Sequence, residues 1–351
     1  MTTDLTPDAG NSARNSTGNS TGNGTGNGTA RSAARRWREQ LLSGGSWTVL
    51  ALLVLVLAVI VAINPSFAEP VSLMAFAKKA APLVVLAVGQ YFVIVSGEFD
   101  LSVGSLVGAQ VVIAARLMDG DEALTWPVVG LMLVFGLLVG LVNGLVTTLL
   151  RVPSFITTLG MMLVLFGAIR LWTGGAPTGA LSEGFRVLGR KGFPDVPGQF
   201  QVPYALLVAL VVVGVAAWLM RRPFGRSLMA TGDNAVAAAY SGASVWWLRT
   251  RAFLLSSFLA TVAAVLIGGF AGVTAQVGQG LEFMAITAVV LGGVALGGGR
   301  GTVVAAMVGA LTLEALFTLF NQLALPSTIR PAVQGVILIA AVAYAARRRR
   351  T

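Results

Sequence analysis

Between Trp47 and Tyr344 the chain is a series of apolar blocks, each about long enough to cross a bilayer. A helix needs roughly 20 residues to cross ~30 Å of hydrocarbon, and blocks such as 127–150 and 203–220 have that length. Of all residues, 56% are hydrophobic and 11% are charged, against roughly a quarter charged in soluble domains. The chain is therefore predicted to be an all-α, polytopic membrane protein, because a helix satisfies its own backbone hydrogen bonds in lipid.

The composition excludes several kinds of chemistry. The chain has no cysteine and no histidine, so disulfides, thiolate metal sites and a Ser-His-Asp triad are excluded. No catalytic residue, cofactor or metal is predicted, and the chain is not expected to be an enzyme. The net charge of +10 is attributed to membrane orientation and not to nucleic acid binding, because arginines cluster at the ends of the apolar blocks.

Basic residues at both ends of the apolar region predict that both termini are cytoplasmic. Arginines between 31 and 38 precede the first block, and Arg347–Arg350 follow the last. The number of crossings is then even. Lys78 and Lys79 would fall on the outer side, which disagrees with the positive-inside rule. An amphipathic segment at 70–80, or an error in the second crossing, would explain these lysines. About ten crossings are predicted, at 47–63, 81–96, 103–117, 127–150, 153–173, 203–220, 251–273, 284–298, 302–321 and 331–346.

Three regions are predicted along the chain. Residues 1–43 form a polar N-terminal tail, expected to be disordered because its Asn/Gly/Thr repeat cannot bury a core. Residues 44–346 form the transmembrane domain, and 347–351 form a basic C-terminal tail.

Two interruptions of the apolar blocks carry unusual residues. Glu98 and Asp100 lie between the second and third crossings, and Gly297–Gly299 lie between the eighth and ninth. Paired interruptions in the two halves of a chain indicate a central pathway. The acids suggest a proton or cation relay or a substrate contact, or else helix capping. Capping is favoured because Asp100, with Ser102 after it, is typical of a helix start.

Polar residues inside spans are candidates for a translocation path. Glu314 is an acid within an apolar block, and Asn321, seven residues on, lies on the same helical face. Such an acid should face the protein interior or an aqueous path. With polar side chains from other spans, the candidate path residues are Asn143, Thr157, Glu314 and Asn321.

A basic loop after the sixth crossing contains a short alanine-rich helix. Asp233 or Asn234 can cap its start and Gly242 can end it. Such a helix either docks a soluble partner or lies on the membrane surface. The chain has no phosphate-binding G-x-x-x-x-G-K-[ST] loop, so any ATP that drives transport must be bound by another subunit.

Four segments together resemble the permeases of sugar-type ABC importers, the ribose and xylose branch of the branched-chain amino acid/ribose permease superfamily. They occur in the order of that family, although Glu98 and Phe99 replace its common Gly-Ile. The segments are GEFDLSVGSLVGA (97–109), VPSFITTLGMMLVLFGAIRLWTGG (152–175), PFGRSLMATGDNAVAAAYSGASV (223–245) and GQGLEFMAITAVVLGGVALGGGRGTV (278–303).

The resemblance implies a multi-pass permease subunit in the bacterial plasma (inner) membrane. It would form a homodimer around a path for carbohydrate (monosaccharide), receive its cargo from an extracytoplasmic sugar-binding protein, and be driven by a cytoplasmic ABC ATPase. The loop helix would then contact the ATPase. The residues expected at this coupling contact are Asp233, Asn234, Ala238, Ser241 and Gly242.

Two other functions stay open at this point. The same kind of machine can carry branched-chain amino acids, whose zwitterion would require charged groups or helix ends along the path. A proton-coupled secondary carrier would instead use Glu98, Asp100 or Glu314 as its proton site. A channel is disfavoured because the sequence has no filter-like repeat.

Overall fold

The computed structural model describes residues 46–176, 178–196, 200–274, 276–326 and 328–348, all within the unit Gly44–Thr351. The predicted N-terminal tail and residues 349–351 lie outside them. Ten helices among the described residues overlap the ten predicted crossings, with different bounds in several cases. They are α2 (Ser46–Ile63), α3 (Pro70–Val95), α4 (Val103–Met118), α5 (Thr125–Thr148), α6 (Ser154–Thr173), α8 (Tyr204–Arg221), α11 (Val245–Ala271), α12 (Leu281–Leu291), α13 (Val303–Gln322) and α14 (Ile329–Arg348).

Within the described residues, six helices are long and apolar enough to cross a membrane: α3, α5, α6, α8, α11 and α13. The shorter apolar helices α2, α4 and α12 accompany them. Two of these, α4 and α12, adjoin the predicted interruptions, which explains their length. The fold is thus helical, with six long candidate spans and additional short ones.

Smaller elements fill the connections. A 3-10 turn η1 (Pro65–Ala68) precedes α3, a second one, η2 (Glu122–Leu124), precedes α5, and α9 (Pro223–Asp233) and α10 (Ala235–Tyr240) lie between α8 and α11. The connection from α6 to α8 contains α7 (Glu183–Arg190) and an antiparallel hairpin of β1 (Gly192–Val196) and β2 (Phe200–Pro203). This hairpin departs from the all-α prediction.

Helices α3 and α11 form the centre of the body. Helix α11 packs on α3, α4, α5 and α7, while α3 also packs on α8, α12 and α13. Glycines let α5 approach α11: a Cβ on Gly136 would lie 2.3 Å from Thr261 Oγ1, and one on Gly140 would lie 2.8 Å from the Phe253 carbonyl oxygen. These two glycines of α5 therefore serve helix packing.

The second predicted crossing is wrong at its start. Helix α3 begins at Pro70 and not at 81, so Lys78 and Lys79 lie inside the helix. Lys79 Nζ lies 2.7 Å from Glu314 Oε1 on α13, and Lys78 Nζ donates to the Arg190 carbonyl oxygen at 3.4 Å. A carboxylate partner across the bundle makes a lysine tolerable within a span, and the chain's linear order does not show that partner.

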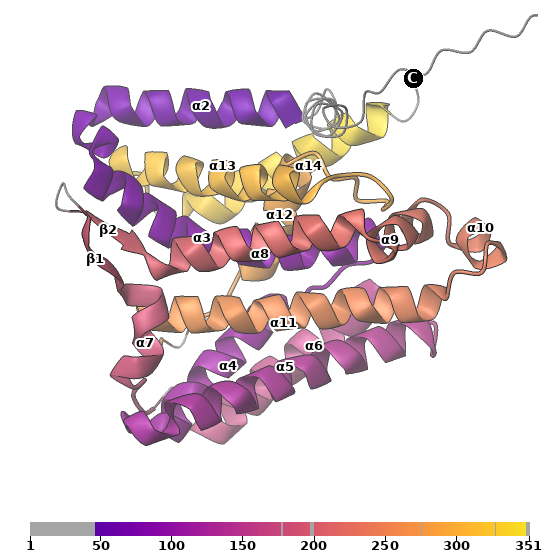
Figure 1. Ribbon diagram of the computed structural model, residues 1–351, viewed down its shortest axis with the longest axis horizontal. Coiled ribbons are helices and arrows are strands. Elements are labelled where there is room, and N and C mark those ends of the chain that lie inside the picture. Colours follow the sequence, from indigo (N-terminus) through magenta and orange to yellow (C-terminus); the bar gives the residue numbers. More distant parts are fainter. Residues whose placement is uncertain (1–45, 177, 197–199, 275, 327, 349–351) are drawn as a thin grey trace, which may run out of the picture. The chain divides into compact units, whose positions relative to one another are not determined.

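The helix connections gather at two ends of the bundle (Figure 1). The β1–β2 hairpin and α7 lie at one end, and α9 and α10 lie at the other. We name these the hairpin end and the α10 end. At the α10 end the connections touch: the Phe99 N–H donates to Ser154 Oγ at 3.1 Å, and the Gly299 N–H donates to the Val95 carbonyl oxygen at 2.9 Å.

Candidate functional site

A buried polar cluster holds the break between α3 and α4. Asp100 Oδ1 accepts hydrogen bonds from the backbone N–H of Ser102 at 3.0 Å and from its hydroxyl at 2.7 Å. Asp100 Oδ2 accepts from the Ser256 hydroxyl at 3.0 Å, and Asn143 Nδ2 donates to Ser102 Oγ at 2.9 Å. All four side chains are buried. The Asp100 carboxylate thus holds the turn before α4 and does not cap the helix, because the N-cap residue of α4 is Ser102 and no side-chain cap hydrogen bond is found there.

Four glycines bring three distant segments together at the α10 end. A Cβ on Gly232 would lie 1.9 Å from the Val95 carbonyl oxygen and 2.6 Å from Gly299 N. A Cβ on Gly298 would lie 2.9 Å from Gly97 Cα. Side chains of any other residue type would separate these backbones. We name Gly97, Gly232, Gly298 and Gly299 the glycine junction.

The glycine junction connects α9 to both helix interruptions. Gly97 follows α3, Gly298 and Gly299 lie between α12 and α13, and Gly232 lies in the last turn of α9. Helix α10 follows directly after it. The last turn of α9, just before α10, therefore contacts the α3–α4 break and the α12–α13 break through backbone atoms.

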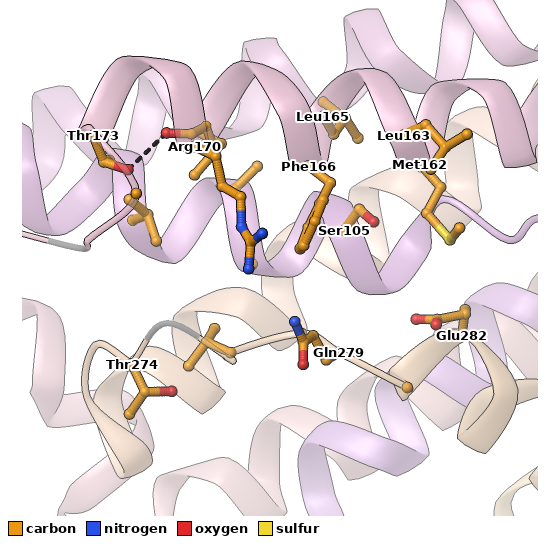
Figure 2. Close-up of a pocket in the computed structure, with 18 residues that line it drawn as sticks. Ser105, Met162, Leu163, Leu165, Phe166, Arg170, Thr173, Thr274, Gln279 and Glu282 are labelled. Atoms are coloured by element: carbon orange, nitrogen blue, oxygen red, sulfur yellow. Dashed lines mark hydrogen bonds between the residues drawn. The ribbon is translucent and has the colours of Figure 1, made fainter.

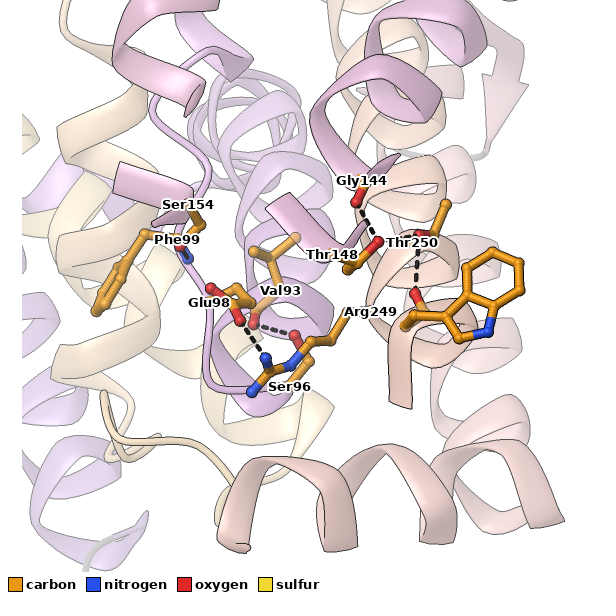
Figure 3. Close-up of polar contacts among 10 residues, drawn as sticks. Val93, Ser96, Glu98, Phe99, Gly144, Thr148, Ser154, Arg249 and Thr250 are labelled. Carbon is orange, nitrogen blue, oxygen red and sulfur yellow. Dashed lines mark hydrogen bonds and ion pairs between the residues drawn. The ribbon is translucent and has the colours of Figure 1, made fainter. Parts of the chain in front are cut away.

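An ion pair joins Glu98 to Arg249, as Figure 3 shows. Arg249 Nη1 at the start of α11 is 2.8 Å from Glu98 Oε1, and the two side chains are 25% and 12% exposed. Arg249 Nη2 also lies 3.7 Å from the Cβ position of Gly97. The pair ties the α3–α4 break to α11.

Replacing Arg249 with glutamine is expected to destabilise the protein by about 2 kcal/mol, because a largely buried Glu98 then loses its charged partner. The measurement is thermal unfolding of the purified protein in detergent. The double variant Glu98→Gln/Arg249→Gln should regain part of that loss, since it leaves no unpaired charge. Arg251→Gln is the control, because Arg251 is exposed and stacks on Trp247 with 4.9 Å between guanidinium carbon and ring centre. Equal losses for Arg249→Gln and Arg251→Gln would refute the role of the pair.

Helix α10 is a short helix with an intact N-cap. Asn234 Oδ1 accepts the backbone N–H of Ala237 at 2.9 Å, as the sequence predicted. The Ser241 hydroxyl donates to the Ala237 carbonyl oxygen at 3.0 Å, and Gly242 has a φ of +84° that ends the helix. Asp233 lies 3.9 Å from Arg300 in an exposed pair, which contributes little to stability.

The two sides of α10 differ. Ala238 is 5% exposed and faces the body, so it fixes the helix in place. Val236 and Tyr240, four residues apart and hence on one face, are 65% and 89% exposed. These two residues are not among the predicted coupling residues, although their i, i+4 spacing on a capped helix indicates a shared face. Whether the five predicted coupling residues contact a partner stays a prediction.

The four predicted path residues do not form one site. Asn143 belongs to the buried polar cluster, and Thr157 Oγ1 on α6 is buried without a hydrogen-bond partner. Glu314 pairs with Lys79, and Asn321 Oδ1 accepts from Arg330 Nη2 on α14. Glu314 therefore links α13 to α3. A transport role for the four residues stays a prediction.

A cavity of about 260 Å³ lies between α4, α6 and the segment leading into α12. Figure 2 shows Arg170 and Phe166 of α6 on one side and Gln279 and Glu282 on the other. Ser105, Thr173 and Thr274 also line it. None of the predicted path residues lines this cavity, and the sequence alone did not show that these three segments meet.

Glycines of α4 shape the wall beside Glu282. A Cβ on Gly104 would lie 1.9 Å from Glu282 Oε2, and one on Gly108 would lie 2.4 Å from the Val277 carbonyl oxygen. The Glu282 carboxylate thus occupies the space that a side chain at 104 would fill. The G-x-x-x-G spacing in VGSLVGA is the sequence signal for this close approach.

The sequence of the chain is similar to the sequences of known transport proteins. Residues 72–342, from α3 into α14, match the family model described as branched-chain amino acid transport system / permease component. The chain is 32% identical over 269 residues to the autoinducer 2 import system permease protein LsrC of Escherichia coli O9:H4 (strain HS), covering 76% of this chain and 77% of that protein. It is 33% identical over 272 residues to LsrC of Salmonella paratyphi B, covering 76% of each. No solved structure matches the chain.

Proposed function

The chain belongs to the family of branched-chain amino acid transport system permease components, and on this premise we propose that it is the permease subunit of an ATP-driven importer for monosaccharides. Members of this family are multi-pass proteins of the bacterial inner membrane that work with ATPase and binding-protein partners. They transport cargo and catalyse no covalent reaction. In the proposal the six long apolar helices span the membrane, the shorter helices complete the membrane domain, and both termini and the α10 end lie in the cytoplasm.

The contact with the ATPase is assigned to α10 because of one observation. Val236 and Tyr240 of α10 are exposed. Directly before α10, Gly232 contacts both helix interruptions as part of the glycine junction. Aromatic residues often dominate binding at protein interfaces. An ATPase that holds this face can therefore move the α3–α4 and α12–α13 breaks together, which is what alternating access requires.

Co-purification with the candidate ATPase tests this assignment. The double variant Val236→Ala/Tyr240→Ala is expected to weaken the complex at least about 30-fold, since an exposed aromatic anchor contributes about 2 kcal/mol or more. Asn234→Ala should weaken it less, through fraying of α10. The control is Leu171→Ala, which removes an equally exposed apolar side chain (87%) from the hairpin end. A complex that survives deletion of 235–240 would refute the assignment.

The proposed cargo is a monosaccharide because the four motifs resemble those of the ribose and xylose branch. A branched-chain amino acid is the second candidate, favoured by the description of the matched family. Uptake into vesicles containing the permease, ATPase and binding protein separates the two. Labelled pentose should accumulate with ATP, and excess L-leucine should not compete. Accumulation of leucine with no uptake of any sugar would favour the second candidate.

A homodimer and an extracytoplasmic sugar-binding protein complete the proposal. The binding protein would dock at the hairpin end, opposite α10. The second copy would cover part of the exposed apolar surface of α6, which includes Phe155, Leu163 and Val164, each more than half exposed.

A further inference from the structure

We infer that the cavity between α4, α6 and the segment leading into α12 is a binding site for one neutral, polyhydroxylated molecule of monosaccharide size, with Glu282 as its hydrogen-bond acceptor. This inference rests on the proposed function and adds that the permease itself contacts the cargo. The cavity is open space bounded by α4, α6, Thr274 and residues 277–282. At about 260 Å³ it lies just below the roughly 300–1,000 Å³ of common ligand pockets, which favours a small ligand.

Glu282 is the strongest indication of a ligand. Its residue is 7% exposed, it lines the cavity, and none of the ion pairs found among the described residues includes it. A carboxylate has about four acceptor positions, so donors can be accommodated. Sugar hydroxyls supply such donors without adding a charge.

The opposite wall supplies complementary groups. Phe166 is half-exposed on α6, and the Arg170 guanidinium carbon lies 4.3 Å from its ring centre. The aromatic face can contact the C–H face of a sugar ring, and the guanidinium can donate to ring or hydroxyl oxygens. The Gln279 amide adds groups that both donate and accept.

The arrangement suits a sugar better than an amino acid. An α-amino acid carries its ammonium and carboxylate on one carbon, so the two partner charges must be adjacent. Figure 2 shows Arg170 and Glu282 apart, with Gln279 between them in that view. A polyol places hydroxyls around its whole ring and can reach separated groups at once.

The cavity also lies where transport requires a transient site. Glu282 is in the first turn of α12 and Ser105 in the first turn of α4, the two helices that adjoin the interruptions. Both interruptions contact α9 through the glycine junction. A movement transmitted from α10 would thus shift two walls of the cavity relative to α6.

Protection from thiol labelling tests the inference. Because the natural chain has no cysteine, Ser105→Cys in the full-length protein in lipid nanodiscs reports on the cavity alone. Millimolar D-ribose, D-xylose or L-arabinose is expected to slow maleimide labelling at least about fivefold, and L-leucine is not. Ser66→Cys, on the exposed η1 turn, should be unaffected by any of them. If Ser105→Cys is labelled too slowly to measure, Thr274→Cys on the exposed rim of the cavity serves as a second reporter.

Glu282→Gln in the reporter background should raise the half-protecting sugar concentration about tenfold, because a hydrogen bond to a charged acceptor is replaced by a neutral one. The matched control is Glu183→Gln, an exposed carboxylate on α7, which should change nothing. No protection at either reporter by any of the three sugars overturns the inference, as does equal protection in Glu282→Gln. If vesicles take up sugar but sugar does not protect the reporters, the proposed function stands and only this inference fails. If vesicles take up no sugar, the proposed function itself is refuted.

Discussion

Replacing Gly232 with alanine is expected to destabilise the protein by about 3 kcal/mol and to abolish ATP-dependent transport. The added Cβ would lie 1.9 Å from the Val95 carbonyl oxygen and 2.6 Å from Gly299 N. Both are backbone atoms that cannot rotate away, so overpacking costs the upper part of its usual ~1–3 kcal/mol range. Thermal unfolding and reconstituted uptake measure the two effects.

The control for this prediction is Gly214→Ala on α8, where nothing lies within 4 Å of the added Cβ. Both glycines are helical, and a glycine-to-alanine exchange within a helix is by itself stabilising by about 0.5–1 kcal/mol. If Gly214→Ala raises the free energy of unfolding and Gly232→Ala lowers it, the difference measures the steric effect at the glycine junction. If Gly232→Ala were as stable and active as Gly214→Ala, the glycine junction would carry no functional contact.

Replacing Lys79 with methionine is expected to destabilise the protein by about 3 kcal/mol. The change leaves Glu314, whose side chain is 6% exposed, without its charged partner inside a span, and breaking a buried pair costs ~3–5 kcal/mol. The lower value applies because Lys79 is 40% exposed. The midpoint of thermal unfolding in a defined detergent gives the change in stability.

A double-mutant cycle distinguishes the pair from a general effect of losing a lysine. Lys79→Met/Glu314→Gln removes both charges and should recover most of the stability lost in Lys79→Met alone. Lys78→Met is the neighbouring control, because Lys78 contacts a backbone carbonyl and the Phe270 ring instead of a carboxylate. Additive losses in the cycle would show that Lys79 and Glu314 do not stabilise each other.

The positions of the long helices followed from the sequence because a lipid-spanning helix needs a continuous apolar run of a minimum length. The start of α3 did not follow, since two lysines interrupt the apolar run and Glu314, which makes one of them tolerable, is more than two hundred residues away. The β1–β2 hairpin was also missed. It lies outside the spans, where apolar periodicity carries no information.

The two parts of the candidate site differ in the same way. The α10 helix was predictable because its cap, Asn234, and its end, Gly242, are local signals. The cavity was not, since α4, α6 and α12 each supply only part of its lining. Asn143 and Glu314 were assigned to a path because polar residues in spans suggest one. Their partners, Ser102 and Lys79, became visible only in three dimensions.

The Lys79–Glu314 pair has a consequence for bioenergetics. Lys79 lies nine residues after the start of α3 and Glu314 lies eight before the end of α13, so both are roughly 12–14 Å along their helices from the hairpin end. One isolated charge moving through the full membrane voltage would exchange ~2.3 kcal/mol per 100 mV. An ammonium and a carboxylate that travel together exchange none, so the cell's resting voltage does no net work on this pair during the transport cycle.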